Sequence, residues 1–258
     1  MTSANDLKVS LFIPVYNAFA YIPNTINEAY SALSASCSEF EIVIVDDNSN
    51  DQTGAFLHSI DQAKYPREKT VRVITNTTGP SRRENLAAAF SSARHDVIAF
   101  IDADLSCGMT YLVKALERLK EENADVVIGS RYIKGAKVTR EPFRRVMSFF
   151  YNLTIQILFF SKILDHQCGL KVFRKAVATS IINDMGYDHA YHRGWFWDAE
   201  FLIRAQARKL KIVEMPVEWH FARTSTFHFF REWKCIGTML KLRVKLMPWF
   251  KRSNITAS

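Results

Sequence analysis

Residues 96–106 read Asp96-Val97-Ile98-Ala99-Phe100-Ile101-Asp102-Ala103-Asp104-Leu105-Ser106. The apolar centre, residues 97–101, is rich in β-branched and aromatic residues, which is typical of a strand buried on both faces of a parallel sheet. Asp102 and Asp104 follow where this strand should end. In open α/β sheets, ligands bind just beyond the carboxyl ends of the strands.

Two interpretations of this pair of carboxylates stay open on these residues alone. Acidic side chains two residues apart can share a hard divalent cation, which takes oxygen ligands and often completes its shell with substrate phosphates. Alternatively, Asp102 and Asp104 are solvated acids that cap a helix starting near Tyr111. The first interpretation predicts a metal–diphosphate site, and the second predicts only a helix start.

The flanking sequence predicts an α/β fold with a doubly wound, mostly parallel sheet. Short apolar strands are expected at residues 9–13, 41–45, 71–75 and 125–128, and helices between them at 21–34, 86–93 and 111–121. Strands that alternate with helices in this way favour parallel pairing. A chain of 258 residues with 48% hydrophobic content can form one domain with an appendage.

Polar residues also follow the second and third predicted strands. Asp46 and Asp47 stand where a carboxylate commonly binds a ribose hydroxyl or a base edge, which is the favoured interpretation, with an Asx-type turn and N-cap as the alternative. The loop after the third strand holds Gly79 and the paired Arg82 and Arg83. These residues suit phosphate contact near a helix N-terminus, or else mark a solvated helix start.

The net charge of +8 is concentrated in two segments that are also rich in apolar residues. Residues 129–175 hold ten Lys or Arg against two acidic residues, and residues 220–258 hold eight against one. This pattern favours an anionic membrane surface or phosphate-bearing substrates, and we expect no nucleic-acid partner. Four separated cysteines and a polar start without a signal peptide predict a cytoplasmic protein, peripheral on the cytoplasmic face of a membrane.

Each basic segment contains a predicted amphipathic helix. Residues 142–164 are long enough to suggest a spanning helix, but Arg144, Ser148, Asn152 and Gln156 form one polar stripe. A helix lying in the membrane interface is therefore expected, with a core helix as the alternative. The second helix should begin near Phe227 and end at Pro248, followed by a disordered tail. The predicted domains are residues 1–226 and the appendage 227–258.

Several motifs resemble the family 2 glycosyltransferases with a GT-A fold, in order and spacing. They are Ile13-Pro14-Val15-Tyr16-Asn17, Val45-Asp46-Asp47-Asn48-Ser49, Asp102-Ala103-Asp104-Leu105-Ser106 and Gly129-Ser130-Arg131. Residues 165–174 (Asp-His-Gln-Cys-Gly-Leu-Lys-Val-Phe-Arg), with 194–200 and 214–219, are similar to the polyprenyl-phosphate (dolichyl-phosphate) hexosyltransferases. The resemblance covers about Leu11 to Thr226. It implies a GT-A type, Rossmann-like sheet with interfacial C-terminal helices.

The resemblance implies a role for each matching position. The donor-binding residues would be Pro14, Tyr16, Asp46, Asp47, Arg82, Asp102, Ala103 and Asp104. The catalytic residues would be Asp102, Asp104, Arg131 and Asp198. Asp104 and Ser106 would hold Mg²⁺ or Mn²⁺ on the diphosphate. The acceptor phosphate would meet Arg131, Arg144, Arg145 or Arg223.

The implied activity is metal-dependent transfer of a hexose, with inversion, from UDP-glucose or GDP-mannose to polyprenyl or dolichyl phosphate. A lipid monophosphate has a second pKa of about 6, so it is largely dianionic at neutral pH and needs no strong base. Asp198 and Glu200 could supply a base to a hydroxyl acceptor, or cap and orient the helix 198–209. A glycan or glycolipid hydroxyl acceptor, and a non-catalytic sugar-nucleotide-binding module, are the alternatives.

Two positions depart from the family pattern. Ala18 stands where the family usually has glutamate after the Tyr-Asn pair, which puts one base or ribose contact in doubt. Ser106 stands where dolichyl-phosphate mannose synthases often have glutamine. This difference indicates which subgroup the chain resembles more than it indicates a loss of activity. The Gln167-Cys168-Gly169 run favours glucose as the transferred sugar and UDP-glucose as the donor.

Overall fold

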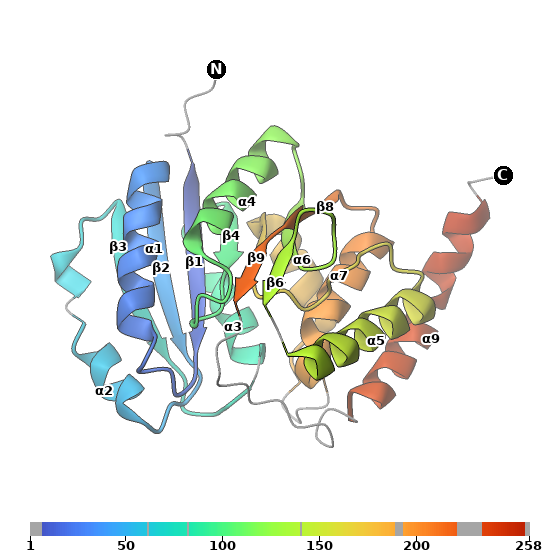
Figure 1. The fold of residues 1–258 in the computed structure, drawn as a ribbon, viewed down its shortest axis with the longest axis horizontal. Coiled ribbons are helices and arrows are strands. Elements are labelled where there is room, and N and C mark those ends of the chain that lie inside the picture. Colours follow the sequence, from blue (N-terminus) through green and yellow to red (C-terminus); the bar gives the residue numbers. More distant parts are fainter. Residues whose placement is uncertain are drawn as a thin grey trace.

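The computed structural model describes residues 7–60, 62–81, 83–139, 141–188, 193–220 and 234–255 (Figure 1). Helices lie on both faces of a central sheet, and α5 and α9 lie together beside it. The strands are β1 (Lys8–Val15), β2 (Glu39–Asp46), β3 (Lys69–Thr75), β4 (Val97–Phe100), β5 (Val126–Ser130), β6 (Lys137–Thr139), β7 (Lys171–Arg174), β8 (Ile212–Pro216) and β9 (Glu218–His220). The α-helices are α1 (Ile22–Ser36), α2 (Gln52–His58), α3 (Glu84–Ala89), α4 (Met109–Glu121), α5 (Pro142–Phe159), α6 (Lys175–Met185), α7 (Trp197–Ala207) and α9 (Lys234–Ile255).

The main sheet has the strand order β3-β2-β1-β4-β7-β5-β8. Its neighbouring strands are parallel except at β7, which is antiparallel to both β4 and β5. β6 and β9 form a separate two-stranded sheet. The predicted α/β class and mostly parallel sheet are confirmed. The sequence did not predict β7 as a strand, because four residues inside a polar motif carry too short a pattern.

Two apolar layers enclose the sheet. One face packs against α1, α2 and α4 through residues such as Ile26, Leu57 and Leu112. The other face packs against α3, α6 and α7 through residues such as Leu86 and Phe201. Because strands buried on both faces need apolar side chains on both, β1, β2 and β4 are near-continuous hydrophobic runs.

A third apolar cluster joins α5, α7 and α9. Ile155 and Phe159 of α5 pack with Ile203 of α7 and with Met239 and Leu242 of α9. Both late helices are therefore fixed to the sheet domain by side chains that are almost fully buried.

The helix expected to end at Pro248 instead continues to Ile255. A proline removes one backbone donor, and the turns before it are held by the buried Met239, Leu242 and Leu246. Residues 251–255 are thus helical, not part of a disordered tail. The predicted domain boundary at residue 226 and the predicted helix start at Phe227 lie outside the described residues.

Candidate functional site

The carboxyl ends of β1, β2, β4 and β5 meet at one edge of the sheet, here called the carboxyl edge. The parallel register of β1 with β2 and β4 brings Tyr16, Asp47 and Asp102 to this edge. Arg131 follows β5 at the same edge, because β5 runs in the same direction as β4 across the intervening antiparallel β7. The predicted strand-end residues are therefore neighbours.

A chain of four charges crosses the carboxyl edge. The guanidinium of Arg83 donates to Asp102 Oδ1 at 3.0 Å and to Asp198 Oδ2 at 3.2 Å. Lys171 Nζ lies 2.8 Å from the other oxygen of Asp198 and also donates to the Cys168 carbonyl. Arg83 and Lys171 both lie over the ring of Phe100. We call Asp102, Arg83, Asp198 and Lys171 the Asp102 network.

Asp198 is a buried carboxylate with a cation on each oxygen. Burial alone would raise its pKa, but Lys171 and Arg83 together hold the pKa below its ordinary value. A carboxylate kept ionised by two cations is a weak proton acceptor. This geometry assigns Asp198 to orienting Arg83 and Lys171 better than to the general-base role that a hydroxyl acceptor would require.

Asp104 differs from Asp102 in having no cation beside it among the described residues. Its Oδ1 accepts a hydrogen bond from the Ser106 backbone N–H at 3.0 Å, and within the described ranges it makes no ion pair. Burial and then the charge of Asp102 raise the pKa of Asp104. A desolvated carboxylate beside a second carboxylate suits a hard divalent cation, so Asp104 and Ser106 fit the predicted metal.

The metal site is not a complete protein cage. The described residues contain no group of three or more His, Cys, Asp or Glu side chains that could hold a metal ion. A cation at Asp104 would take most of its ligands from a diphosphate and from water, as Mg²⁺ commonly does.

Gly169 forms one wall against the Asp102 network. A Cβ atom at this position would lie 1.9 Å from Asp102 Oδ2, so only glycine leaves room for the carboxylate. Nearby, a Cβ atom at Gly129 would lie 2.7 Å from Cys168 Sγ. The contact of Gly169 with Asp102 was missed from the sequence, although the Gln-Cys-Gly run that contains it was noted.

Arg131 is already occupied by a carboxylate. Its Nε and Nη2 lie 2.7 and 2.8 Å from the two oxygens of Asp165, and its backbone N–H adds a third bond at 3.0 Å. The side chains are 6% and 0% exposed, and the guanidinium lies over the Trp219 ring. The predicted acceptor contact of Arg131 thus competes with a buried bidentate pair, and the geometry favours a structural role.

Asp46 and Asp47 hold the loops of the carboxyl edge in place. Asp47 accepts hydrogen bonds from the Ser81 N–H and hydroxyl and from the Asn85 amide. Asp46 Oδ1 accepts from the Ser49 N–H, three residues further on, at 3.1 Å and so holds the turn after β2. Both carboxylates are buried. Their predicted contacts with the nucleotide sugar remain predictions, and such contacts require these loops to open or the carboxylates to accept further hydrogen bonds.

The remaining predicted site residues are less constrained. Pro14 pairs with Val45 as the second-to-last residue of β1, and Tyr16 is half-buried just beyond the strand. Arg144 lies 3.6 Å from Glu141, whereas Arg145, in the first turn of α5, is exposed. Arg82 and Arg223 lie outside the described residues, so their predicted contacts stay predictions.

α5 presents its apolar face outward. Its polar stripe faces the protein: Asn152 Oδ1 accepts from the His166 N–H and ring, and the Gln156 amide donates to the Ile163 carbonyl. The outward face carries large apolar side chains that are at least half exposed, namely Phe143, Val146, Phe149, Phe150 and Ile157. α9 adds Leu240 and Val244. We call these seven residues the apolar face.

An apolar face of seven large side chains that the described residues leave exposed marks an interaction surface. None of the described helices combines the length and the hydropathy needed to cross a bilayer. The buried hydrogen bonds explain why the polar stripe of residues 142–164 points inward, which its sequence period alone did not reveal.

The family model for glycosyl transferase family 2 matches residues 10–181 of this chain, which include β2 to β7, most of β1, and the strand-end residues from Tyr16 to Arg131. The chain belongs to glycosyl transferase family 2. Family membership confirms the resemblance drawn from the strand-end motifs.

Three relatives are similar over most of this chain. Glycosyltransferase AglD of Haloferax volcanii is 29% identical over 84% of the chain and 34% of its own length. Dolichyl-phosphate beta-glucosyltransferase of Saccharomyces cerevisiae is 28% identical over 83% of the chain and 67% of its own length. Dolichol-phosphate mannosyltransferase of Pyrococcus furiosus is 31% identical over 81% of the chain and 56% of its own length. The chain thus spans between a third and two thirds of these relatives.

A solved structure shares the fold. Glucosyl-3-phosphoglycerate synthase from Mycobacterium tuberculosis, in complex with Mn²⁺, UDP and glucosyl-3-phosphoglycerate, superposes with a TM-score of 0.63 at 17% identity. The match covers 92% of this chain and 79% of the other. At this identity the likeness establishes the GT-A fold.

Proposed function

We propose that this protein transfers glucose from UDP-glucose to a polyprenyl or dolichyl phosphate, with inversion, at the cytoplasmic face of a membrane. The outward apolar face of α5 and α9 carries the proposal, because an enzyme with a soluble acceptor gains nothing from exposing these side chains. The names of the relatives above support a lipid phosphate acceptor and leave GDP-mannose as the alternative donor.

The donor would bind at the carboxyl edge, with Tyr16 and the Asp46–Asp47 loops on the nucleoside side. Asp104 and Ser106 would hold Mg²⁺ or Mn²⁺ against the diphosphate; a GT-A structure with bound Mn²⁺ and UDP supports this class of cofactor. When bound, such a cation would neutralise charge on the leaving nucleoside diphosphate.

The reaction is a single displacement at the anomeric carbon. An oxygen of the acceptor phosphate would form the new C–O bond as the bond to the nucleoside diphosphate breaks, and the leaving group departs with the electron pair. The acceptor is already an anion, so no proton has to be removed. This chemistry agrees with a carboxyl edge where Asp198 is bound by two cations.

The acceptor phosphate needs a cation that is not already paired. Arg145 is exposed in the first turn of α5, next to the apolar face, whereas Arg131 is buried on Asp165. Backbone N–H groups at a helix start also attract phosphate. We therefore favour Arg145 over Arg131 for the lipid phosphate, with the polyprenyl tail along the outward face of α5.

The experiment is a donor and acceptor panel with the full chain. Radiolabelled UDP-glucose and GDP-mannose are each supplied with a short polyprenyl phosphate or with the matching polyprenol, and product is extracted into organic solvent. Label transfer from UDP-glucose to the phosphate only is expected. Transfer to the alcohol would indicate a hydroxyl acceptor, and no transfer from either donor would contradict the proposal.

A further inference from the structure

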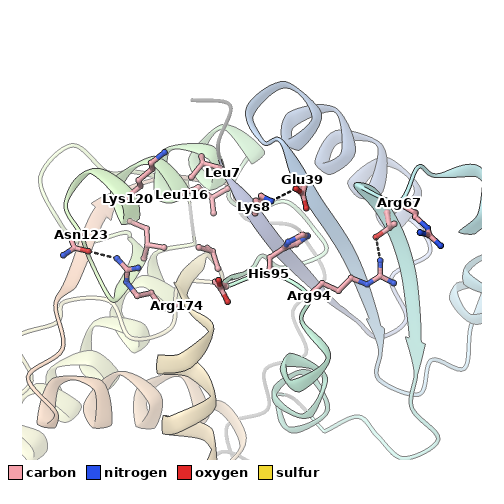
Figure 2. Close-up of a pocket in the computed structure, with 14 residues that line it drawn as sticks. Leu7, Lys8, Glu39, Arg67, Arg94, His95, Leu116, Lys120, Asn123 and Arg174 are labelled. Atoms are coloured by element: carbon pink, nitrogen blue, oxygen red, sulfur yellow. Dashed lines mark hydrogen bonds and ion pairs between the residues drawn. The ribbon is translucent and has the colours of Figure 1, made fainter. Parts of the chain in front are cut away.

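A cavity lies at the opposite edge of the sheet from Asp102 and Asp104. Its volume is about 750 Å³, and it opens where β1, β2 and β4 begin and where α4 and β7 end (Figure 2). Leu7, Val97 and Leu116 give it an apolar part. A cavity of this size accommodates a molecule as large as a sugar phosphate or a nucleotide.

Cations outnumber carboxylates around this cavity. The cations are Lys8, Arg67, Arg94, Lys120 and Arg174, and the carboxylates are Glu39 and Asp96. Glu39 is already paired with Lys8. Among the described residues, Arg67 and Lys120 make no ion pair, so the cavity keeps an excess of positive charge that its own acids do not neutralise.

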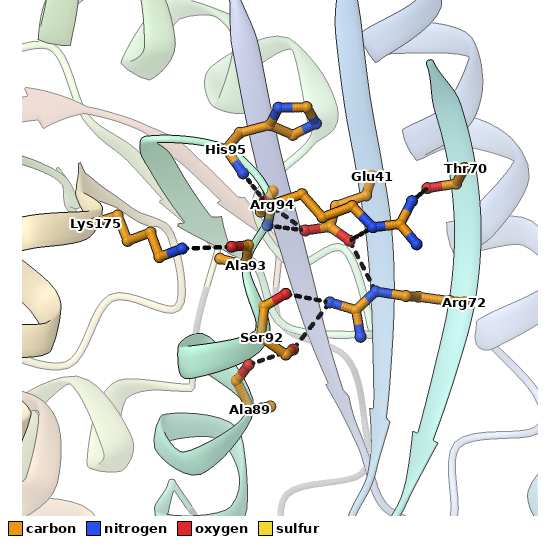
Figure 3. Close-up of polar contacts among 10 residues, drawn as sticks. Glu41, Thr70, Arg72, Ala89, Ser92, Ala93, Arg94, His95 and Lys175 are labelled. Atoms are coloured by element: carbon orange, nitrogen blue, oxygen red, sulfur yellow. Dashed lines mark hydrogen bonds and ion pairs between the residues drawn. The ribbon is translucent and has the colours of Figure 1, made fainter. Parts of the chain in front are cut away.

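A fully buried carboxylate holds one cation of the cavity in place (Figure 3). Glu41 Oε1 accepts from the Ser10 hydroxyl and from the Arg94 backbone N–H, both at 2.6 Å. Its Oε2 accepts from Arg72 Nε at 2.7 Å and lies 3.6 Å from Arg94 Nε. Glu41 is 0% exposed.

Further bonds fix the same loop. The His95 N–H donates to the Ser10 hydroxyl, Lys175 Nζ donates to the Ala93 carbonyl, and Arg72 Nη2 donates to Ser92. Burying a carboxylate is unfavourable unless all its oxygens are hydrogen-bonded. Here that bonding immobilises residues 92–95, and the Arg94 guanidinium is left 56% exposed at the cavity.

We propose that this cavity binds a small organic phosphate, with Arg94 and Arg67 on the phosphate, and with the apolar part and Lys120 at the other end of the cavity against the rest of the molecule. Arginine suits phosphate because its planar fork donates two parallel hydrogen bonds. The site shares no residue with the carboxyl edge, so the proposal does not depend on the proposed glycosyl transfer.

Isothermal titration of the full chain in a metal-free buffer with chelator tests the site. The probes are inorganic pyrophosphate, glucose 6-phosphate and AMP. The cavity variant carries Arg94→Gln and Arg67→Gln, both exposed side chains. The matched control carries Lys114→Gln and Arg118→Gln in α4. These substitutions also remove two positive charges, but neither residue lines the cavity.

At least one probe should bind the natural chain and the control with one site, and the cavity variant should bind it about 10-fold or more weakly. Asp104→Asn should leave this binding unchanged, which separates it from donor binding. Equal binding by the cavity variant, or no binding of any probe at millimolar concentration, would overturn the proposal.

A second arm presents the phosphate as phosphatidic acid in neutral-lipid vesicles. We expect no difference in vesicle binding between the cavity variant and the control, because a soluble phosphate is the ligand proposed. A loss of vesicle binding confined to the cavity variant, without binding of the soluble probes, would overturn the soluble ligand in favour of a lipid headgroup.

Discussion

The Arg83 guanidinium bridges Asp102, at the end of β4, and Asp198, in the first turn of α7, at 3.0 and 3.2 Å. These two carboxylates are 96 residues apart in the chain, and a single cation fixes their relative position. Since Asp102 lies beside the proposed metal ligand and Asp198 lies on the proposed acceptor side, Arg83 sets the distance between the two halves of the site.

Replacement of Arg83 should therefore reduce turnover more than stability. Arg83→Gln leaves two carboxylates without their shared cation, and we expect kcat to fall about 100-fold or more, the usual effect of losing one group that organises a charged site. Arg83→Lys should recover little, because one ammonium cannot span both acids. Arg118→Gln is the control. Near-normal kcat in Arg83→Gln would contradict this role.

Asp104→Asn tests the metal. The substitution keeps the shape of the side chain but removes a charged ligand, so the rate should fall by a factor corresponding to several kcal/mol, while the melting temperature changes little. Mg²⁺ or Mn²⁺ should be required by the natural chain and chelator should abolish its activity. Asp96→Asn, at the other end of the same strand, serves as control. Undiminished activity of Asp104→Asn in chelator would disprove metal dependence.

Arg131 and Asp165 should behave as one structural unit. Arg131→Ala leaves Asp165 buried and unpaired, so the free energy of unfolding should fall by about 3–5 kcal/mol. The double variant Arg131→Met with Asp165→Leu should regain most of it, as measured by urea unfolding. If the double variant is stable but inactive, a direct phosphate contact by Arg131 would be supported instead.

His166 makes stability depend on pH. Its ring is buried, with Nδ1 2.9 Å from Asn152 Oδ1 and Nε2 2.9 Å from the Ser161 hydroxyl, and burial lowers its pKa to about 4. The unfolded chain, with an ordinary histidine pKa of about 6.5, binds the proton first as pH falls.

The contribution of neutral His166 to the free energy of unfolding is therefore complete above pH about 6.5. It is lost as pH falls toward about 4, which lowers the free energy of unfolding by about 3 kcal/mol. Urea unfolding at pH 5 and pH 7 should detect about 2 kcal/mol of this change, because the rest is lost below pH 5. His166→Gln should be less stable at pH 7 and should show a smaller difference between the two pH values. An unchanged difference would assign the pH dependence to other groups.

The apolar face should bind anionic vesicles. Phe149→Ser with Phe150→Ser should reduce flotation about 10-fold or more, since each aromatic ring transferred from water contributes about 1.5–3 kcal/mol. High salt should weaken flotation of the natural chain by screening its lysines and arginines. Phe19→Ser, an exposed aromatic away from α5, is the control, and equal flotation of all three proteins would refute the membrane contact.

Much of the fold could be predicted, because the sequence of a single buried strand is enough to identify it as a strand. The apolar runs at 9–13, 41–45 and 97–101, each followed by polar residues, are enough to place Asp47 and Asp102 at one edge. The short β7 could not be predicted, because its place between β4 and β5 is set by pairing with strands far away in sequence.

The sequence predicted which residues belong to the site better than it predicted the groups with which they form hydrogen bonds and ion pairs. Arg131, Asp165, Lys171 and Asp198 all stand in recognisable motifs, but whether a cation meets a substrate or a buried acid depends on tertiary distance. Arg83 was noted only as one of two arginines in a loop, and its bridge to Asp198 has no local signal. The inward direction of the polar stripe on α5 likewise depends on His166 and the segment that follows the helix.

The antiparallel β7 has a consequence for synthesis of the chain on the ribosome. Between the emergence of Val97–Phe100 and that of Lys171–Arg174, about seventy residues later, β4 has β1 as its neighbour and an unpaired apolar edge on its other side. Exposed edges of this kind favour pairing with other chains. Fragments that stop before Lys171 should therefore aggregate, and nascent chains of this length should be substrates for chaperones that shield strand edges.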